Sequence, residues 1–470
     1  MVNLTAKLTD IRDWMIYVSH KLRENAELEV FLIYVVAGLG VLLRNVVYKT
    51  VWRAVNKPFG CTFLFEFVCL VVPMVLVQTI LGDHVFETVT FFVALILVLV
   101  ITFYMRLISQ AQWNGVSLSA VGTTQALNNS ITWYRSMVLI TTTVAILAVD
   151  FPIYPNRFYK TRAYGHSLMD TGTAAFIFIS GLSDFRATIR YGNRIRTPYI
   201  TILSVSFPSI FVLLILGLGR TISLKLFSYH QNIAEYGAHW NFFVTLFFLR
   251  FYVWIVGYRR AVPLGLLIGI LYQLVLSFTD LEHWIVRLDV YPRVGFIDEN
   301  REGIFSLLGY AFLYSLAMIY ARLSSKVLLK KEHLSLMGIF TGLGLAVFSY
   351  ILHKLFEIYF KIEPSRRLAN LPYAFSMAAL FSVSVSGLQL FNYFIPAPTS
   401  PGSSCDLSEA ISRNGLVYFL IANVITGIVN MLNLPGVYVS GELPETTFLI
   451  FYSLTLCVII SYYNYINSRR

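Results

Sequence analysis

Long apolar runs recur along the whole chain, and short polar segments separate them. A membrane-spanning helix needs about 20 mostly apolar residues. Such runs are predicted near Val30–Leu43, Phe59–Leu81, Phe86–Ile108, Ser136–Phe151, Ser167–Phe185, Tyr199–Ile222, Ala238–Tyr258, Val262–Val286, Ile304–Leu323, Met337–Phe356, Ala369–Phe394, Gly415–Leu432 and Thr446–Ile466. The fourth is short, and Asp280 and Glu282 interrupt the eighth. The pattern predicts an all-α polytopic membrane protein with about 13 transmembrane helices in a single bundle.

The segment before the first run has a different pattern. Leu4, Leu8, Ile11 and Met15 recur at spacings of three and four, which predicts a helix lying in the membrane surface or a solvated leader packed on the domain. We therefore divide the chain into an N-terminal segment 1–27, a membrane domain 28–466 and a short cytosolic tail 467–470. No small-residue cleavage site follows the first apolar run, so we expect that run to serve as an uncleaved signal.

Composition agrees with the hydropathy pattern. Apolar residues make up 57% of the chain and charged residues 13%, whereas soluble proteins average about 45–50% apolar. The net charge of +11 comes from Lys and Arg spread singly between apolar runs, so we expect no nucleic-acid partner. The four cysteines show no metal-ligand spacing, and we expect no zinc site, no disulfide framework and no resident cofactor.

An odd number of spans places the two termini on opposite faces of the membrane. The positive-inside rule then puts the C-terminus in the cytosol and the N-terminus outside, which is the lumen of an internal membrane in a eukaryotic cell. Cations also gather in three outside connectors, Arg157–Arg162, Arg287–Arg301 and Lys354–Arg367. These connectors either bind an anionic head group or are solvated loops.

The connector between the fourth and fifth runs is the richest in reactive groups. Asp150 ends one apolar run, Pro152 and Pro155 stop that helix, and Lys160 follows before Asp170 opens the next run. A carboxylate at a helix C-terminus faces the negative end of the helix dipole, so Asp150 needs a compensating cation or proton. Lys160 is the nearest flexible candidate. The pair is either an active-site constellation or an interfacial ion pair that fixes the turn.

A second candidate segment is AEYGAHWNFF, residues 234–243, with Glu235, His239 and Asn241 at the start of a span. Glu235 and His239 are four residues apart and would share a helix face if the helix begins early enough. An acid that orients an imidazole is a general-base arrangement. A lone histidine at a helix start is also an ordinary interfacial residue.

Further cations and amides precede two later spans on the same predicted face. Arg301 lies in ENREGIFSLLGY, and Arg366, Arg367 and Asn370 lie in EPSRRLANLPY. Arg301 has no role in stabilising the helix dipole and would suit a phosphate.

Asn423 and Asn430 lie on one side of the span near Gly415–Leu432. A polar stripe in lipid is either helix-packing glue or the wall of a polar cavity. The same alternatives apply to Glu66 and Arg250, which lie mid-span and could pair with each other.

The chain contains no HExxH, GxSxG or P-loop motif, so the geometry of a metalloprotease, serine hydrolase or NTPase is missing. It carries instead AVDFPIYPNRF with Lys160, GxxLMDTG, EYGAHWNFF, NREGIFS, SRRLANLPY and NGLVYFLIANVITGIVN, in this order. Together these blocks resemble the PIG-W/Gwt family, which acylates the inositol of glucosaminyl-phosphatidylinositol in glycosylphosphatidylinositol (GPI) anchor synthesis. The resemblance covers the chain from about Met137 to its end.

This resemblance implies a multi-pass enzyme of the endoplasmic reticulum with thirteen spans. Such an enzyme transfers a long acyl chain, usually palmitoyl, from acyl-CoA to the inositol 2-hydroxyl on the lumenal side. Its partners would be acyl-CoA, glucosaminyl-phosphatidylinositol and the bilayer, with a homo-oligomer left open. The resemblance also places Asp150 and Lys160 at the active site. His166 departs from the pattern, because a small hydroxylic residue is expected there, and we assign it no role.

The chemistry requires a base for a secondary hydroxyl and stabilisation of a thioester oxyanion. We expect direct transfer with Asp150 as the base, and Lys160 stabilising the oxyanion or holding a CoA phosphate. Asp170, Glu235, His239, Asn241, Asn370, Asn423 and Asn430 would line the site, and Arg301, Arg366 and Arg367 would hold anionic head groups. No cysteine lies in these motifs, which disfavours an acyl-enzyme, although Ser306 stays open. A transporter or lipid flippase is the competing class, and a structural subunit of a lipid-modifying complex is a third.

Overall fold

The computed structural model describes residues 25–50, 59–109, 123–191, 199–202, 205–226, 233–286, 293–328, 336–395 and 407–469. The α-helices are α2 Ala26–Thr50, α3 Phe59–Leu70, α4 Val72–Val77, α5 Val85–Ser109, α6 Thr123–Ala148, α7 Thr171–Tyr191, α8 Ser209–Leu226, α9 Phe242–Val256, α10 Tyr258–Phe278, α11 Leu281–Val286, α12 Gly295–Glu299, α13 Arg301–Leu328, α14 Leu336–Ile358, α15 Leu371–Phe394, α16 Leu407–Arg413, α17 Gly415–Met431 and α18 Glu442–Arg469. Most of the predicted leader lies outside the described residues.

Three short helical turns and one hairpin complete the described elements. The turns are η1 Gly82–His84, η2 Asn156–Phe158 and η3 Leu434–Tyr438. Strands β1 Tyr199–Ile202 and β2 Val205–Pro208 pair antiparallel, with Tyr199 opposite Pro208. The span predicted from Tyr199 is therefore wrong at Tyr199–Ile202 and Val205–Pro208, because β-branched residues favour strands there and the helix begins only at Ser209.

Nine helical segments in the described part of the chain are long and apolar enough to cross a membrane. The pair α16 and α17, bent by 88°, makes a tenth if it counts as one span. This confirms an all-α polytopic membrane protein, while the number thirteen stays a prediction. The three remaining predicted spans correspond to α7, α8 and α9, and the apolar stretches of the last two are short, at Ile210–Ser223 and Phe242–Val256.

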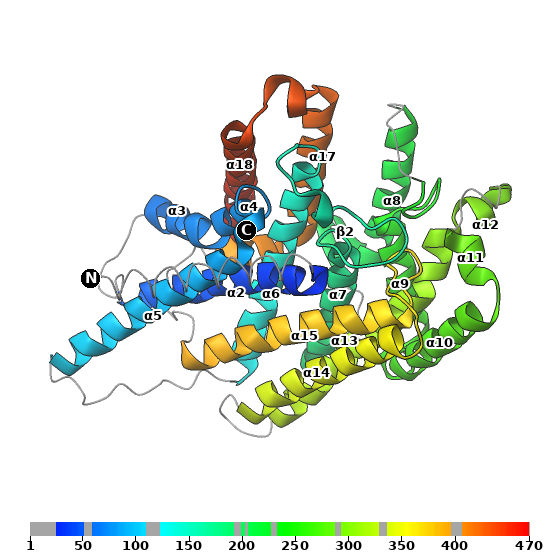
Figure 1. The fold of residues 1–470 in the computed structure, drawn as a ribbon, viewed down its shortest axis with the longest axis horizontal. Coiled ribbons are helices and arrows are strands. Elements are labelled where there is room, and N and C mark those ends of the chain that lie inside the picture. Colours follow the sequence, from blue (N-terminus) through cyan, green and yellow to red (C-terminus); the bar gives the residue numbers. More distant parts are fainter. Residues whose placement is uncertain are drawn as a thin grey trace, which may run out of the picture.

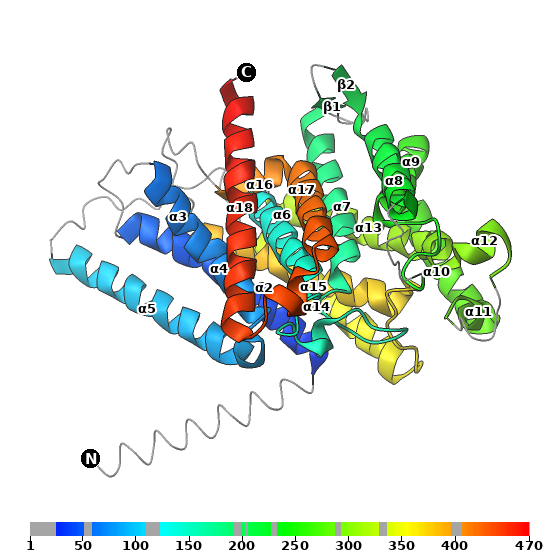
Figure 2. The same ribbon diagram turned by 90° about the horizontal axis from the view of Figure 1, so that it is seen from above.

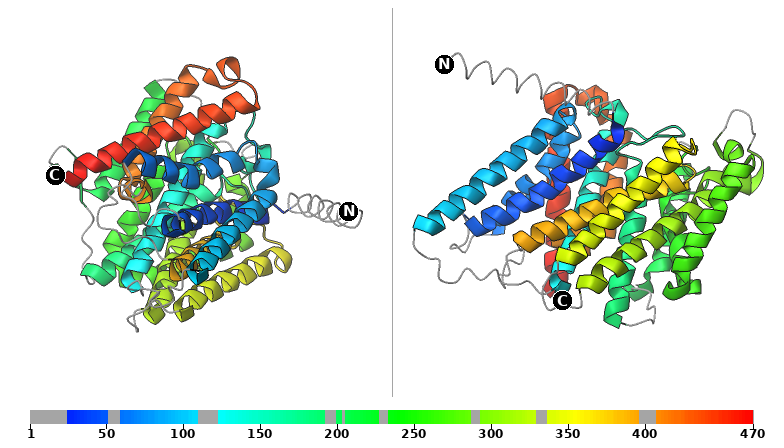
Figure 3. Two further views of the ribbon diagram at one scale, coloured as in Figure 1. Left: turned by 90° about the vertical axis from the view of Figure 1, so that its left-hand side faces the viewer. Right: turned by 60° about the horizontal axis from the view of Figure 1, so that its bottom comes forward.

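The helices pack around a central pair, α6 and α7. Helix α7 packs against α13, and α6 contacts α15, α16 and α17, so both lie inside the bundle in Figure 2. Helices α13, α14 and α15 lie side by side in Figure 1. Figure 3 shows α2 running along α5, with α15 on the other side of α2.

Two glycines allow close helix contacts beside the loops described below. A Cβ on Gly181 of α7 would lie 2.6 Å from the Cβ of Ala317 on α13. A Cβ on Gly309 of α13 would overlap the carbonyl oxygen of Ala369, in the turn before α15. The absence of a side chain at these positions brings α7 and the start of α15 onto α13.

The two mid-span charges predicted to pair with each other have different partners. Glu66 accepts from Arg44 of α2, with 2.7 Å between Oε1 and Nη2. Arg250 of α9 pairs with Asp184 of α7, which also accepts from the Tyr314 hydroxyl at 3.0 Å. The prediction of a Glu66–Arg250 pair is wrong. Each charge is neutralised by a neighbouring helix, as burial in a bundle requires.

Candidate active site

The connector after α6 is a folded loop. Helix α6 ends at Ala148 and the chain turns at once, as the following prolines predict. Phe151, Tyr154 and Phe158 are each about 1% exposed, so they anchor the loop in the core. The polar residues on either side of these three, Asp150 and Lys160, are exposed at the surface of the bundle. The loop therefore presents an acid and an amine from a fixed backbone.

Asp150 meets the end of α17. Its Oδ2 accepts a hydrogen bond of 2.8 Å from the Asn430 side-chain amide. Burial raises the pKa of Asp150, while the Asn430 hydrogen bond and the charge of Lys160 oppose that rise. The net effect is a carboxylate of higher proton affinity than an ordinary aspartate. One residue of the predicted amide stripe thus contacts the predicted base.

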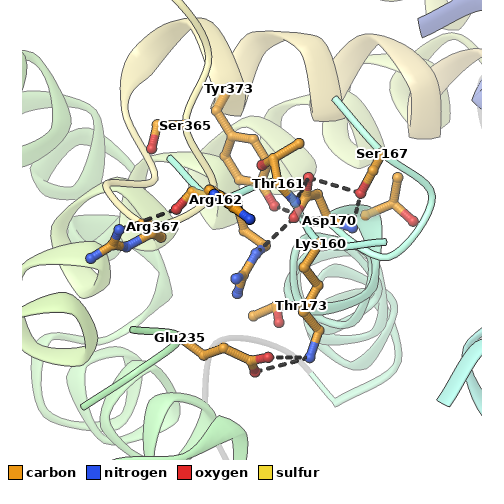
Figure 4. Close-up of polar contacts among 12 residues, drawn as sticks. Lys160, Thr161, Arg162, Ser167, Asp170, Thr173, Glu235, Ser365, Arg367 and Tyr373 are labelled. Atoms are coloured by element: carbon orange, nitrogen blue, oxygen red, sulfur yellow. Dashed lines mark hydrogen bonds and ion pairs between the residues drawn. The ribbon is translucent and has the colours of Figure 1, made fainter. Parts of the chain in front are cut away.

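Lys160 binds Glu235. Its Nζ lies 2.7 Å from Oε1 and 2.9 Å from Oε2 of that carboxylate, as Figure 4 shows. The interfacial Asp150–Lys160 ion pair considered from the sequence is absent among the described contacts, although Lys160 is near enough to affect the pKa of Asp150. Burial alone would raise the pKa of Glu235, but Lys160 and Arg366 hold it below the ordinary value.

The expectation that Glu235 orients His239 is wrong. Helix α9 begins only at Phe242, with Asn241 as its N-cap, so the two residues lie in an irregular segment. His239 instead lies 3.1 Å from a carboxylate oxygen of Glu299. Residues four apart in the sequence share a helix face only if both belong to the same helix.

A second ion pair, which is buried, lies beside Lys160. Arg366 Nε donates to Asp170 Oδ1 at 2.8 Å, and the two side chains are 5% and 1% exposed. Asp170 Oδ2 also accepts from the Ser167 hydroxyl at 2.9 Å and from the Thr161 backbone N–H at 3.2 Å. Figure 4 shows Lys160 between Asp170 and Glu235. Burial opposes the charge of Arg366, and Asp170 and Glu235 raise its pKa overall.

Several of the predicted polar residues surround one cavity of about 200 Å³. Its polar lining includes Lys160, Glu235, Arg366 and Asn423, and Asp150 follows a residue that lines it, Val149. The apolar lining consists of side chains such as Phe176, Phe242 and Phe419, with Ala145, Ile146, Leu168 and Met169. A polar edge and an apolar body suit an amphipathic substrate.

Sequence reasoning missed six polar residues of this cavity. They include Arg220 of α8, Tyr236, and Thr173 of α7; the others are Thr141, Thr142 and Thr171. The Tyr236 hydroxyl and Thr173 Oγ1 lie 2.6 Å apart. Tyr236 could have been found by its position next to Glu235, whereas a single arginine in an apolar run carries no such signal.

The other predicted substrate-binding residues lie outside the lining of this cavity. Asn241 caps α9 by accepting from the backbone N–H groups of Phe243 and Val244 at 3.0 and 3.3 Å. Asn370 caps α15 by accepting from Tyr373 N–H at 3.3 Å. These contacts are ordinary helix caps.

Arg301 and Arg367 are buried outside the cavity lining. Arg301 lies 5.2 Å from the Trp284 ring centroid and is 0% exposed. Arg367 pairs with Glu302 at 3.0 Å, and Glu302 also pairs with Arg293 at 2.5 Å. These contacts place both arginines in the protein interior. Their expected binding of anionic head groups stays a prediction.

Comparison with known proteins finds the same family that the motifs resemble. The GWT1 family model matches residues 18–463. The chain is 33% identical over 340 residues to GPI-anchored wall transfer protein 1 of Gibberella zeae, covering 64% of this chain and 66% of that relative. It is 32% identical over 364 residues to the Candida albicans protein of the same name, covering 71% and 73%.

A mammalian relative has a more descriptive name. Glucosaminyl-phosphatidylinositol-acyltransferase PIGW of Bos taurus is 31% identical over 420 residues, which is 78% of this chain and 81% of the bovine protein. Because the family model extends over nearly the whole chain, and so includes every residue of the cavity described above, this protein belongs to the GWT1 family.

Proposed function

We propose that the protein transfers a long-chain acyl group, palmitoyl in the first instance, from acyl-CoA to the inositol 2-hydroxyl of glucosaminyl-phosphatidylinositol. Family membership and the name of the bovine relative support the reaction class and the acceptor. The observation that carries the proposal is that one anchored loop holds both Lys160, which lines the cavity, and Asp150, which follows the lining residue Val149. The proposed setting is the endoplasmic reticulum membrane, with the site and the N-terminus lumenal.

Asp150 acts as the general base in this proposal. Its raised pKa increases its ability to take a proton from a sugar hydroxyl. The Asn430 amide donates to Oδ2, which fixes the orientation of the carboxylate and leaves Oδ1 for the substrate. A base held in this way needs no reorganisation as the hydroxyl attacks.

Lys160 supplies positive charge where the thioester oxygen becomes negative. Glu235 grips its ammonium through both carboxylate oxygens, so two of the three N–H donors are directed and one is free to turn to an oxyanion. A preorganised donor of this kind contributes a large share of acyl-transfer catalysis. In this proposal Glu235 is a positioning residue.

The steps balance without a covalent enzyme intermediate. The inositol oxygen forms a bond to the thioester carbonyl carbon as Asp150 takes the hydroxyl proton. The tetrahedral oxyanion, stabilised by Lys160, collapses and breaks the carbon–sulfur bond. The CoA thiolate leaves and takes up the proton. Arg366 and Arg220, which line the cavity, bind the anionic head group.

The test uses microsomes that lack the native activity and express wild type, Lys160→Ala or Lys361→Ala at matched levels. They receive labelled palmitoyl-CoA and glucosaminyl-phosphatidylinositol. Lys361 is an exposed lysine outside the cavity lining and serves as the control. We expect equal acylated lipid from wild type and Lys361→Ala, and about 10²- to 10³-fold less from Lys160→Ala. No product from folded wild type would overturn the proposal in favour of transport.

A further inference from the structure

Three side chains from separate segments meet on the far side of the loop that carries Lys160. They are Glu27 of α2, His166 of the loop before α7, and His353 of α14. Their ligand atoms all lie within 4.8 Å of one another. Glu27 Oε1 is 3.3 Å from His166 Nε2 and 3.1 Å from His353 Nε2. No spacing motif predicts this cluster, because its members are far apart in the sequence.

The hydrogen bonding of His353 directs a lone pair into the cluster. Its Nδ1 lies 3.0 Å from the Pro372 carbonyl oxygen. A carbonyl can only accept, so Nδ1 carries the hydrogen and the Nε2 of a neutral ring presents its lone pair to Glu27. Two acceptors 3.1 Å apart repel each other unless a proton or a cation lies between them.

His166 adds an unsatisfied nitrogen. Its side chain is 9% exposed, and Nε2 has no hydrogen-bond partner within the described part of the chain. The second oxygen of Glu27, Oε2, is likewise buried without such a partner. Buried polar atoms left in this way point to a missing ligand.

The charges around the cluster sum to a negative value, which favours the binding of a dication. Lys354 Nζ lies 2.9 Å from Glu27 Oε1 and 2.6 Å from Glu357 Oε2, and Glu357 Oε2 is 3.7 Å from His353 Nε2. Two carboxylates and one ammonium sum to −1 with neutral imidazoles. The Lys354 side chain is 30% exposed, so it can turn to Glu357 alone when a cation occupies the cluster.

We propose that Glu27, His166 and His353 form a zinc-binding site. Zinc prefers tetrahedral nitrogen and oxygen ligands at about 2.0–2.1 Å, which places neighbouring ligand atoms about 3.3 Å apart. The 3.1 and 3.3 Å separations around Glu27 Oε1 match that geometry. The Nε2 atoms of both histidines and the Glu27 carboxylate supply three ligands. The Pro372 carbonyl orients His353 in the manner common to zinc ligands.

The fourth coordination position faces a second cavity, of about 370 Å³, which Glu27 and His166 line. Its other walls are mostly apolar side chains of α2, α14 and α15. Thr171 lines both this cavity and the one at Lys160. The metal would therefore tie α2 and α14 to the loop that carries Lys160 and Asp170, and with three protein ligands it would keep one coordination position open.

The test measures zinc in the full-length protein purified in detergent without chelator. Wild type, His166→Ser and His283→Ser are each incubated with one equivalent of zinc chloride, desalted and analysed by mass spectrometry. His283 is an exposed histidine outside the cluster. We expect about one zinc per chain in wild type and His283→Ser, and at least about tenfold weaker binding in His166→Ser. No acyltransferase assay is involved, so the proposed function is tested separately.

A second readout guards against misfolding of a variant. Cobalt chloride replaces zinc, and the visible absorption of tetrahedral cobalt reports ligation in protein whose elution from a sizing column is normal. Zinc should also raise the unfolding temperature of wild type and not that of His166→Ser. Wild type without bound metal, or equal binding by wild type and His166→Ser, would overturn the proposal.

Discussion

Replacing Asp170 with Asn should destabilise the protein strongly, because it leaves the buried Arg366 charge without its nearest partner. The pair is 2.8 Å apart, and its side chains are 1% and 5% exposed. At an effective dielectric constant of about 20, its Coulomb energy is about 6 kcal/mol, which is an upper limit. Breaking a buried pair costs about 3–5 kcal/mol. Glu235 continues to attract Arg366, so we expect about 3 kcal/mol.

The assay is reversible unfolding of purified protein in mixed detergent micelles. Glu409→Gln is the matched control, since the Arg413–Glu409 pair is 64% and 46% exposed and should contribute less than about 1 kcal/mol. The double variant Asp170→Leu, Arg366→Met removes both charges and should have a higher free energy of unfolding than Asp170→Asn alone. If Asp170→Asn unfolded like Glu409→Gln, the buried pair would not stabilise this region.

Three further outcomes follow from the same contacts. Asn430→Ala removes a hydrogen bond that lowers the pKa of Asp150; since the base works only when deprotonated, the acidic limb of the kcat/KM profile should move to higher pH, and an unmoved limb would remove Asp150 from the role of base. Glu235→Gln should lower kcat about 10- to 100-fold with little change in KM, because Lys160 loses the carboxylate that positions it. Unchanged kcat in steady-state kinetics would contradict a positioning role for Glu235. Gly309→Ala should destabilise by about 1–3 kcal/mol, because its methyl group meets a backbone carbonyl, and unchanged unfolding would contradict that packing.

The sequence predicted the membrane bundle well because hydropathy is a local property. Apart from the start of the run at Tyr199, the apolar runs lie on helices, and the prolines after Asp150 end α6 where expected. The loop with Asp150 and Lys160 was also identified, since its charges stand out between two apolar runs. These features need no knowledge of which helices are neighbours.

Ion pairs between segments that are distant in the sequence could not be predicted from hydropathy. Lys160 binds Glu235, and Glu66 binds Arg44, because the packing of helices brings those positions together. The amides at the starts of α9 and α15 were predicted to bind substrate, yet they make caps, a role that depends on where each helix begins. His166 carried no signal until its neighbours on α2 and α14 were known.

The most direct measurement is the rate of acyl transfer by Asp150→Asn in purified, correctly folded protein, next to Asp280→Asn. Asp280 is an exposed aspartate outside the cavity lining. Because asparagine keeps the shape of the side chain and removes its basicity, the proposal predicts a loss of about 10²- to 10⁴-fold for Asp150→Asn with normal rates for Asp280→Asn. Near-normal turnover by folded Asp150→Asn would contradict direct transfer with Asp150 as the base.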